Sequence, residues 1–417
     1  MTNYKNNLIF LNYEDDEIKH FTHMKNSTTW RGLLSNEEYV EREKLLGSTS
    51  IANKDQNAEL QRLYPECSKW LGVKYFVVKD QNLPNIDKYS QVVSSCETLN
   101  RIGYCIRPGS NNNEIEPALI VCIGGVFTDV RHRGKGYASY MINSLNKYYD
   151  DVRDQYGSQS KLIQNMVINL YSEIDDYYEK FGYHSMHIPL HNITNFELIL
   201  QQYCKYKPGT HINSTDDKGI NTVQGGKFLG FDGYEHLIIL QDTQFKQNLY
   251  RLAERQPNKF IFTVKPDLDI FIWFHVRDIF IRRKLSPKHE SNDIEIPFGF
   301  SLTDNSHVIW HHHWNENTLI LLKLYIANDD NTSKEDVLRQ LLKQSILEAH
   351  RRNLSKVQFW DEEIPLKMYP ELDQILHNSE NKSQLYQVNG SVSAVRPPTG
   401  LTPEDIIWDN NTKFCWF

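Results

Sequence analysis

Apolar runs alternate with amphipathic segments through the first half of the chain. Residues 118–126, ALIVCIGGV, are almost wholly apolar, which is typical of a strand covered on both faces. Residues 138–149 repeat apolar side chains at three- and four-residue spacing and predict a helix with one buried face. The run at 162–170 predicts a second strand, and 174–180 predicts a short helix that ends at Gly182. This order of elements predicts an α/β sheet.

The second half predicts a similar order of elements after a loop-rich stretch. Residues 208–233 are rich in Gly, Asn, Asp and Thr, which is typical of a connection between units. We therefore predict a first domain at 1–195, a connecting region at 196–235 and a second domain at 236–417 with a buried C-terminal tail. The other predicted elements are helices at 35–46, 245–254, 269–284 and 334–351, and strands at 74–79, 91–96, 298–302, 306–310, 319–326 and 356–360.

Composition narrows the class of protein. The 417 residues exceed one domain of roughly 150 residues. Lys and Arg total 46 against 53 Asp and Glu, and the net charge of −7 argues against a nucleic-acid binder. No apolar run reaches the ~18 residues of a membrane span, and the start MTNYKNNLIF does not resemble a signal peptide. Six scattered cysteines without a CxxC pair fit reduced thiols, so we expect a cytoplasmic protein.

A glycine-containing loop joins the predicted strand at 118–126 to the following helix. Gly134 and Gly136 allow a tight bend that presents backbone N–H groups at the positive end of the helix dipole. Arg133 and Lys135 add charge for a phosphate group. The spacing matches neither GxxxxGK[ST] nor GxGxxG, because position 139 is serine. The loop therefore predicts phosphate binding by a different motif.

This loop resembles the coenzyme A loop of the GCN5-related N-acetyltransferase (GNAT) superfamily, through Arg131-x-x-Gly134-x-Gly136. The block 170–183, LYSEIDDYYEKFGY, is similar to the next motif of that superfamily. The resemblance implies a mixed α/β (α+β) sheet flanked by helices, acetyl-CoA as co-substrate, and Tyr178 as the general acid. It implies that the cofactor-binding residues are Phe127, Thr128, Arg131, Arg133, Gly134, Lys135, Gly136, Tyr137 and Ala138.

Further motifs resemble the fungal L-lysine N-ε-acetyltransferases of lysine catabolism. They are Asn26-Ser-x-x-Trp30-Arg-Gly32, Glu38-Tyr-x-x-Arg42-Glu43, Ser95-Cys-Glu97 and Trp273-Phe-His275 followed by Arg277. The likeness is denser in the first half, and Val130 stands where many members have proline. It implies an N-acetyltransferase that acts on a small-molecule amine, with the ε-amine of free L-lysine as the expected acceptor in a ternary complex.

An ε-amine acceptor requires a base. With a reference pKa near 10.4, only about 1 in 2,500 molecules is neutral at pH 7, equivalent to roughly 4.6 kcal/mol. Glu97, Asp129 and Glu173 are candidate bases, although each could be an ordinary solvated or capping carboxylate. The terminal carboxylate of Phe417 is a fourth candidate, because the end KFCWF is too apolar for a frayed tail.

Candidate substrate-binding and metal residues lie in the second half. Arg277 could bind an α-carboxylate as a fork, and His275 could line the same site. At most two of the three histidines at 311–313 could share a ligand set, because alternate strand residues face opposite sides. With no matching Cys, Asp or Glu spacing, we predict no metal site.

Two other functions stay open from the sequence. A protein acetyltransferase would need an open groove for a basic segment, whereas a free amino acid needs a closed site with a partner for its carboxylate. A non-catalytic scaffold could retain only coenzyme A binding. The second half has no glycine in the connection before residues 334–351, so we predict a degenerate GNAT-like domain that lacks the coenzyme A loop.

Overall fold

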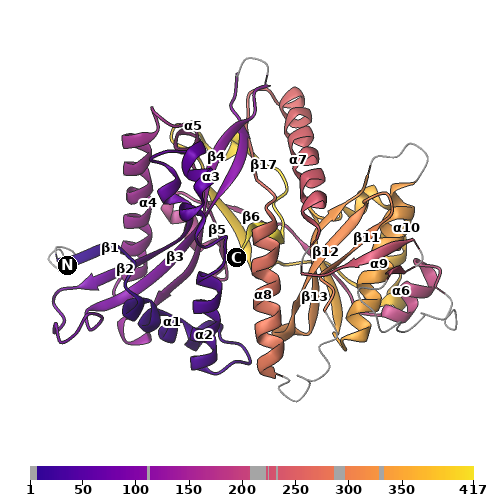
Figure 1. Cartoon of the computed structure of the whole chain (residues 1–417), viewed down its shortest axis with the longest axis horizontal. Coiled ribbons are helices and arrows are strands. Elements are labelled where there is room, and N and C mark those ends of the chain that lie inside the picture. The colour runs from indigo at the N-terminus through magenta and orange to yellow at the C-terminus, as the bar shows by residue number, and fades with distance from the viewer. Residues whose placement is uncertain are drawn as a thin grey trace.

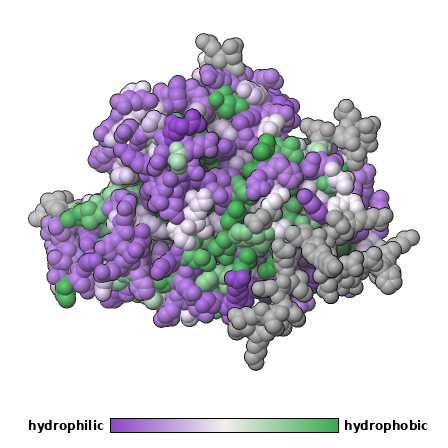
Figure 2. All heavy atoms as spheres, in the orientation of Figure 1, coloured by the Kyte–Doolittle hydropathy of each residue, from purple (hydrophilic) through white to green (hydrophobic). Residues whose placement is uncertain are grey.

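Two mixed β-sheets, each flanked by helices, make up the protein (Figure 1). The computed structural model describes residues 7–109, 113–206, 222–223, 225–231, 233–285, 296–327 and 333–417. In Figure 1 the first half of the chain forms most of the left-hand sheet, and the second half forms most of the right-hand one. The surface in Figure 2 is mainly hydrophilic, and hydrophobic residues gather toward the centre of this face.

The first sheet forms around long central strands. Its path is β1 (Leu8–Tyr13), β2 (Gly72–Asp80), β3 (Val92–Ile106), β4 (Glu116–Thr128), β5 (Val167–Ser172), β16 (Val392–Arg396) and β6 (His184–Met186), with β10 (Phe260–Val264) paired to β3 and β17 (Ile406–Trp408) paired to β10. The predicted apolar stripe of α4 (Tyr137–Tyr156) packs on this sheet with Met141, Ile142 and Leu145 fully buried. Helices α1 (Asp16–Trp30) and α2 (Asn36–Gly47) pack against each other, and α3 (Ala58–Leu63) follows them in the chain.

The second sheet repeats the central order of the first. Its path is β15 (Gln384–Gln387), β7 (Leu190–Ile193), β14 (Lys356–Trp360), β13 (Thr318–Tyr325), β12 (His307–His313), β11 (Gly299–Leu302), β9 (Gly226–Leu229) and β8 (Thr222–Val223). Helix α9 (Lys334–Arg351) joins the parallel pair β13 and β14, as α4 joins the parallel pair β4 and β5. Helices α6 (Phe196–Gln202) and α10 (Pro370–His377) pack against each other, and α6 also packs on α9.

The two sheets exchange strands. β16, from near the C-terminus, pairs with β5 of the first sheet, and β7, from the first half, pairs with β14 of the second sheet. In each sheet, the strand that follows the crossover helix, β5 or β14, is thus paired with a strand from the other half of the chain. The division at 195 and 235 stays a prediction, but strands from 236–417 complete the first sheet.

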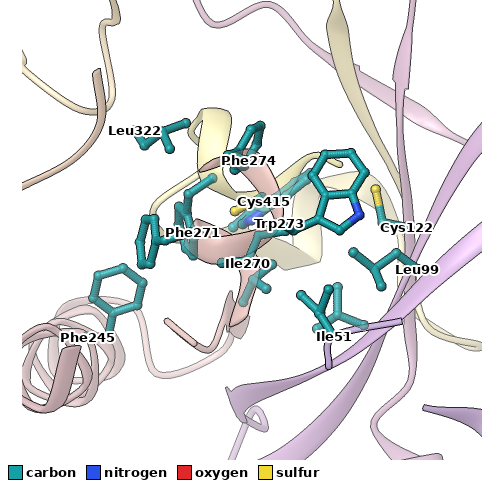
Figure 3. Close-up of a cluster of buried hydrophobic side chains, with 14 of the residues drawn as sticks. Ile51, Leu99, Cys122, Phe245, Ile270, Phe271, Trp273, Phe274, Leu322 and Cys415 are labelled. Carbon is teal, nitrogen blue, oxygen red and sulfur yellow. The ribbon is translucent and has the colours of Figure 1, made fainter. Parts of the chain in front are cut away.

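A hydrophobic cluster joins the halves through α7 (Glu235–Arg255) and α8 (Leu268–Leu285). In Figure 3, Trp273 of α8 lies beside Leu99 and Cys122 of the first sheet, while Phe271 of the same helix lies toward Phe245 of α7. The tail takes part in the cluster, because Phe414 and Cys415 are 0% and 1% exposed. Burial of this kind of apolar surface holds the halves together at about 25 cal/mol per Å².

The fold class predicted from the sequence is confirmed, with local corrections. The run 162–170 is not one strand, because its start forms the short helix α5 (Lys161–Gln164) before β5 begins at Val167. The helix predicted at 245–254 begins ten residues earlier, at Glu235. Much of the predicted loop at 208–233 lies outside the described residues. None of the helices in the described ranges combines the length and apolar character of a bilayer span.

Candidate active site

The glycine loop predicted to bind phosphate is open on its outer side. Gly134 and Gly136 have φ angles of +77° and +84°, and nothing lies within 4 Å of a Cβ added at either position. Gly136 caps α4, and among the described residues no side chain forms a capping hydrogen bond with the start of that helix. Such a turn presents N–H donors to an anion. The residues present therefore fit the pyrophosphate of coenzyme A.

The loop cations are held in different ways. Arg131 donates two hydrogen bonds to the carboxylate of Asp129, at 3.0 and 2.8 Å. Arg133 donates from Nε to the carbonyl of Thr128 at 3.1 Å. No ion pair to a described residue involves Arg133 or Lys135, so both charges are available to a ligand. Arg131 is instead largely used to fix the turn.

Strands β4 and β5 separate beside this loop. They pair in parallel only from Ile120 to Ile123 on β4 and from Val167 to Leu170 on β5. Beyond Ile123 the pairing of β4 with β3 is interrupted by a bulge, where Gly125 has a φ of +57°. Unpaired backbone donors and acceptors at such a bulge can bind an extended ligand. The gap therefore offers a place for the pantetheine arm and the acetyl group.

Glu97 lies directly across from this bulge. It pairs with Gly124 in the β3–β4 register, and a Cβ added at Gly125 would be 3.3 Å from Glu97 Oε1. Its side chain keeps 19% exposure, and Oε2 lies 3.9 Å from Nε2 of the buried His23 on α1. Burial lowers the pKa of His23, but the Glu97 carboxylate outweighs it and leaves that pKa above its ordinary value. The structure thus places a carboxylate at the bulge.

Tyr178 lies in the 3₁₀ turn Asp175–Phe181, which follows β5. Its ring packs on Tyr177 and Tyr183, with centroids 5.3 and 6.1 Å away. Burial raises its pKa, so the phenol stays protonated at neutral pH. Its hydroxyl makes no hydrogen bond within the described part of the chain. The predicted C-cap Gly182 is in the left-handed conformation, as expected.

The C-terminal tail enters the same gap. A Cβ on Gly124 would lie 2.8 Å from the ring of Phe417, and Trp416 stacks on Tyr171 of β5 with centroids 5.4 Å apart. The carbonyl of Phe414 accepts a hydrogen bond from Arg101 at 3.0 Å. The tail is therefore docked beside the separated strands, as its apolar sequence predicts.

Arg277 and His275 lie on different sides of α8. The guanidinium of Arg277 stands over Trp273, 5.0 Å from its ring centroid, and Trp273 lies 6.1 Å from the ring of Phe417. His275 is 0% exposed and stacks on Phe298 at 3.8 Å inside the second half. Arg277 therefore lies close to the C-terminal tail through Trp273, whereas His275 is buried in the core of the second half.

The remaining candidates have other partners. Asp129 is bound by Arg131 and by Lys25, and the hydrogen bond from Arg131 is the main reason that its pKa lies well below the ordinary value. A carboxylate held in this way is a weak base. Glu173 accepts a hydrogen bond from Trp30 Nε1 at 3.0 Å.

The three histidines at 311–313 also divide between two sides. His311 lies near Asp278, and His312 near Glu348, at 3.5 and 3.3 Å. Across the described ranges there is no group of three or more His, Cys, Asp or Glu side chains that could hold a metal ion.

Sequence reasoning missed two residues of this region. His23 was not singled out because a lone histidine in a helix carries no motif; only its distance to Glu97 shows the pairing. Lys413 was quoted as part of the apolar tail, yet it is buried, with Nζ 3.3 Å from the ring centroid of Trp416. A lysine within a tail predicted to be buried was the signal available for the second.

Comparisons with known proteins place the chain in a family. Residues 218–417 match the family model of the LYC1 GNAT-like C-terminal domain. The Saccharomyces cerevisiae protein YGR111W is 51% identical over 410 residues, covering 98% of both chains. A lysine acetyltransferase of Yarrowia lipolytica is 23% identical over 327 residues, which is 70% of this chain and 76% of that one.

A solved GCN5-related N-acetyltransferase from Kribbella flavida has a TM-score of 0.44 and 11% identity, covering 93% of this chain and 71% of that one. The family model matched by residues 218–417 and the relative from Yarrowia lipolytica bear out, at the level of the family, the N-acetyltransferase class expected from the motifs. The chain belongs to the GCN5-related N-acetyltransferase superfamily, shares a family with YGR111W, and resembles the fungal lysine acetyltransferases.

Proposed function

We propose that the protein transfers the acetyl group of acetyl-CoA directly to the ε-amine of free L-lysine, within a ternary complex. The observation that carries this proposal is the arrangement at the β4 bulge, where Glu97 faces Gly125 beside the open loop of Gly134 and Gly136. The similarity to the Yarrowia lipolytica lysine acetyltransferase supports lysine as the acceptor. We further propose that the reaction serves lysine degradation in the cytoplasm.

Binding of the co-substrate uses backbone donors and two cations. When bound, acetyl-CoA supplies the thioester that is cleaved. The first turn of α4 and the loop hold its pyrophosphate, and Arg133 and Lys135 add charge. Phe127, Thr128, Tyr137 and Ala138 flank the loop in the sequence and are proposed to line this path. The unpaired edge of β4 then orients the arm that leads to the acetyl group.

Proton transfer is divided between Glu97 and Tyr178. Glu97 accepts the proton of the acceptor ammonium, because its carboxylate lies beside the bulge and is partly exposed. Tyr178 keeps its proton at neutral pH and donates it to the leaving thiolate. Its hydroxyl makes no hydrogen bond with another described residue, so it is free to do so. Glu97 is thus the proposed base, and Tyr178 is the proposed acid.

The terminal carboxylate of Phe417 is a second candidate base. Its ring already lies against Gly124, so the end of the chain is close to the reacting position. Adding one glycine after Phe417 moves the carboxylate without removing a side chain. A loss of turnover comparable to that in Glu97→Gln would assign the carboxylate a role, and full activity would remove it.

The test of the function is a thiol-release assay with acetyl-CoA. L-Lysine, other amino acids with side-chain amines, simple diamines and a basic peptide serve as acceptors. We expect release with L-lysine and mass-spectrometric detection of its Nε-acetyl product. Activity on the peptide alone would identify a protein acetyltransferase, and binding of coenzyme A without transfer to any acceptor would identify a scaffold.

A further inference from the structure

Two cationic side chains beside the tail have no carboxylate partner. The guanidinium of Arg277 lies 5.0 and 4.9 Å from the ring centroids of Trp273 and Phe274. The ammonium of Lys413 lies 3.3 Å from the ring centroid of Trp416. Neither side chain forms an ion pair or a hydrogen bond with a carboxylate within the ranges that the structure describes. Buried or half-buried cations in this state are unusual, since unpaired charge is costly away from water.

Both side chains lie next to the gap between β4 and β5. Arg277 is one helical turn from Trp273, whose ring is 6.1 Å from that of Phe417. Lys413 is in the short turn Lys413–Cys415 and contacts Trp416, which stacks on Tyr171 of β5. Figure 3 shows Trp273 of α8 beside Cys415 of the tail. Helix and tail thus bring their cations to the region where the acceptor must enter.

The neighbouring acids do not neutralise these charges. Asp278 accepts a hydrogen bond from the backbone N–H of His312 at 2.6 Å, and burial raises its pKa well above the ordinary value, which favours the uncharged form of this carboxyl group. Glu43 pairs with Arg42. Glu173 is engaged by Trp30 at 3.0 Å, and Glu316 is 61% exposed at the rim.

The basic side chains around Arg277 are affected by burial and by its positive charge. Burial lowers the pKa of His313 to about 3 and that of His311 well below its ordinary value, and the charge of Arg277 adds to both effects. Burial and the charge of Arg277 also lower the pKa of Lys413 well below its ordinary value, and a bound carboxylate would raise that pKa again and favour the ammonium form. Burial is the largest cause of each of these shifts, and the charge of Arg277 is the second. A carboxylate beside Arg277 would offset that positive charge.

We propose that Arg277 and Lys413 bind the α-carboxylate of the acceptor and so select free amino acids over other amines. The proposal rests on the proposed function, because it concerns the acceptor of the same reaction. A carboxylate held between α8 and the tail leaves the long side chain of the acceptor to reach toward Glu97 at the bulge. A lysine within a protein has no free α-carboxylate and loses this interaction.

The experiment compares L-lysine with cadaverine, which keeps the chain and the amine but lacks the carboxylate. For the wild-type protein we expect kcat/KM to be at least about tenfold higher for L-lysine, since charge-assisted hydrogen bonds are worth that much or more. Arg277→Gln and Lys413→Met should each raise the KM for L-lysine roughly tenfold and change kcat less. Their effect on cadaverine should be several times smaller than that on L-lysine.

Matched variants separate this role from a structural one. Arg283→Gln removes an exposed arginine from the same helix, and Lys367→Met removes an exposed lysine elsewhere in the second half. Neither should alter the preference for L-lysine. Arg277→Lys keeps the positive charge but loses the two-pronged guanidinium. It should therefore retain part of the preference for L-lysine, and it tests the proposal even if Arg277→Gln folds poorly.

The outcomes distinguish the inference from the function. Equal kcat/KM for L-lysine and cadaverine in the wild-type protein would overturn the carboxylate site alone and leave an amine acetyltransferase. Equal losses on both amines in Arg277→Gln and Lys413→Met would also overturn it. Acetylation of neither amine would overturn both proposals.

Discussion

At the scale of residues, the proposed reaction depends on two side chains with opposite tasks. Glu97 is held at the β4 bulge beside Gly125 and keeps partial exposure. Tyr178 is buried, and burial keeps its phenol protonated. A carboxylate base and a protonated phenol are the pair that the proposed acetyl transfer uses. The hydroxyl of Tyr178 and the negative charge of Glu97 can each be removed by a conservative substitution.

Replacement of Tyr178 by phenylalanine removes only the hydroxyl. We expect kcat to fall on the order of 100-fold, a magnitude typical for loss of a general acid, with little change in acetyl-CoA binding. Tyr177→Phe is the control, because Tyr177 is adjacent and its ring contacts are kept. Steady-state kinetics and calorimetric binding of coenzyme A measure the two effects. Unchanged kcat in Tyr178→Phe would exclude this residue as the acid.

Glu97→Gln tests the base together with its pairing to His23. We expect kcat to fall on the order of 100-fold, and we expect the pKa of His23, followed by NMR of its imidazole, to decrease. A raised folded-state pKa stabilises the protein at pH values below about 6.5, and this contribution is lost as pH rises through the raised value. The variant should therefore lose stability, as measured by urea unfolding, mainly at pH values below about 6.5.

An unchanged pKa of His23 in Glu97→Gln would show that the contact at 3.9 Å carries no energy. Loss of activity with an unchanged His23 titration would still assign Glu97 to catalysis. A variant with full activity would transfer the role of base to another group.

At the scale of elements, the backbone conformation of the loop before α4 explains why it could bind a phosphate group. Its glycines adopt positive φ angles, and no side chain caps the helix behind them. The predicted strand at 118–126 and the helix after it were recognisable because their periodicities differ. The bulge at Gly125 was not recognisable from the sequence. A pair of glycines in an apolar run does not show how the strand is aligned with its partner strand.

Gly136→Ala is expected to raise the KM for acetyl-CoA. A Cβ at this position would enter the space that the loop leaves open, and the left-handed conformation costs an alanine about 1–2 kcal/mol. Gly400→Ala is the matched control, since Gly400 also has a positive φ, of +87°, and open space around it. Both variants should lose similar stability in thermal unfolding. A KM equal to that of Gly400→Ala would argue against binding by the loop.

At the scale of the whole molecule, the halves are interlocked. β16 of the second half completes the first sheet, and β7 of the first half completes the second. The tail, the apolar cluster around Trp273 and Phe414, and the proposed carboxylate site all lie where the halves meet. The second half therefore contributes to the gap even though it lacks a glycine loop of its own.

Residues 1–195 expressed alone are expected not to form a stable domain. They lack β10, β16 and β17, which leaves the edge of β5 and the apolar face behind β3 uncovered. Circular dichroism and size-exclusion chromatography, with the full chain as reference, should show a partly unfolded or aggregated fragment. A monomer that unfolds cooperatively and binds coenzyme A would instead support an independent first domain.

The sequence by itself determined the α/β class, the repeated order of elements, the open glycine loop and the family, because these depend on local periodicity and short motifs. Only the tertiary structure decided that β7 and β16 are exchanged, that His275 is core, and that Lys413 stands near Arg277. The strand exchange and the approach of Lys413 to Arg277 bring together residues more than 100 positions apart, and His275 packs on Phe298 of another segment. Local pattern states which face of an element is buried but not which distant segment covers it.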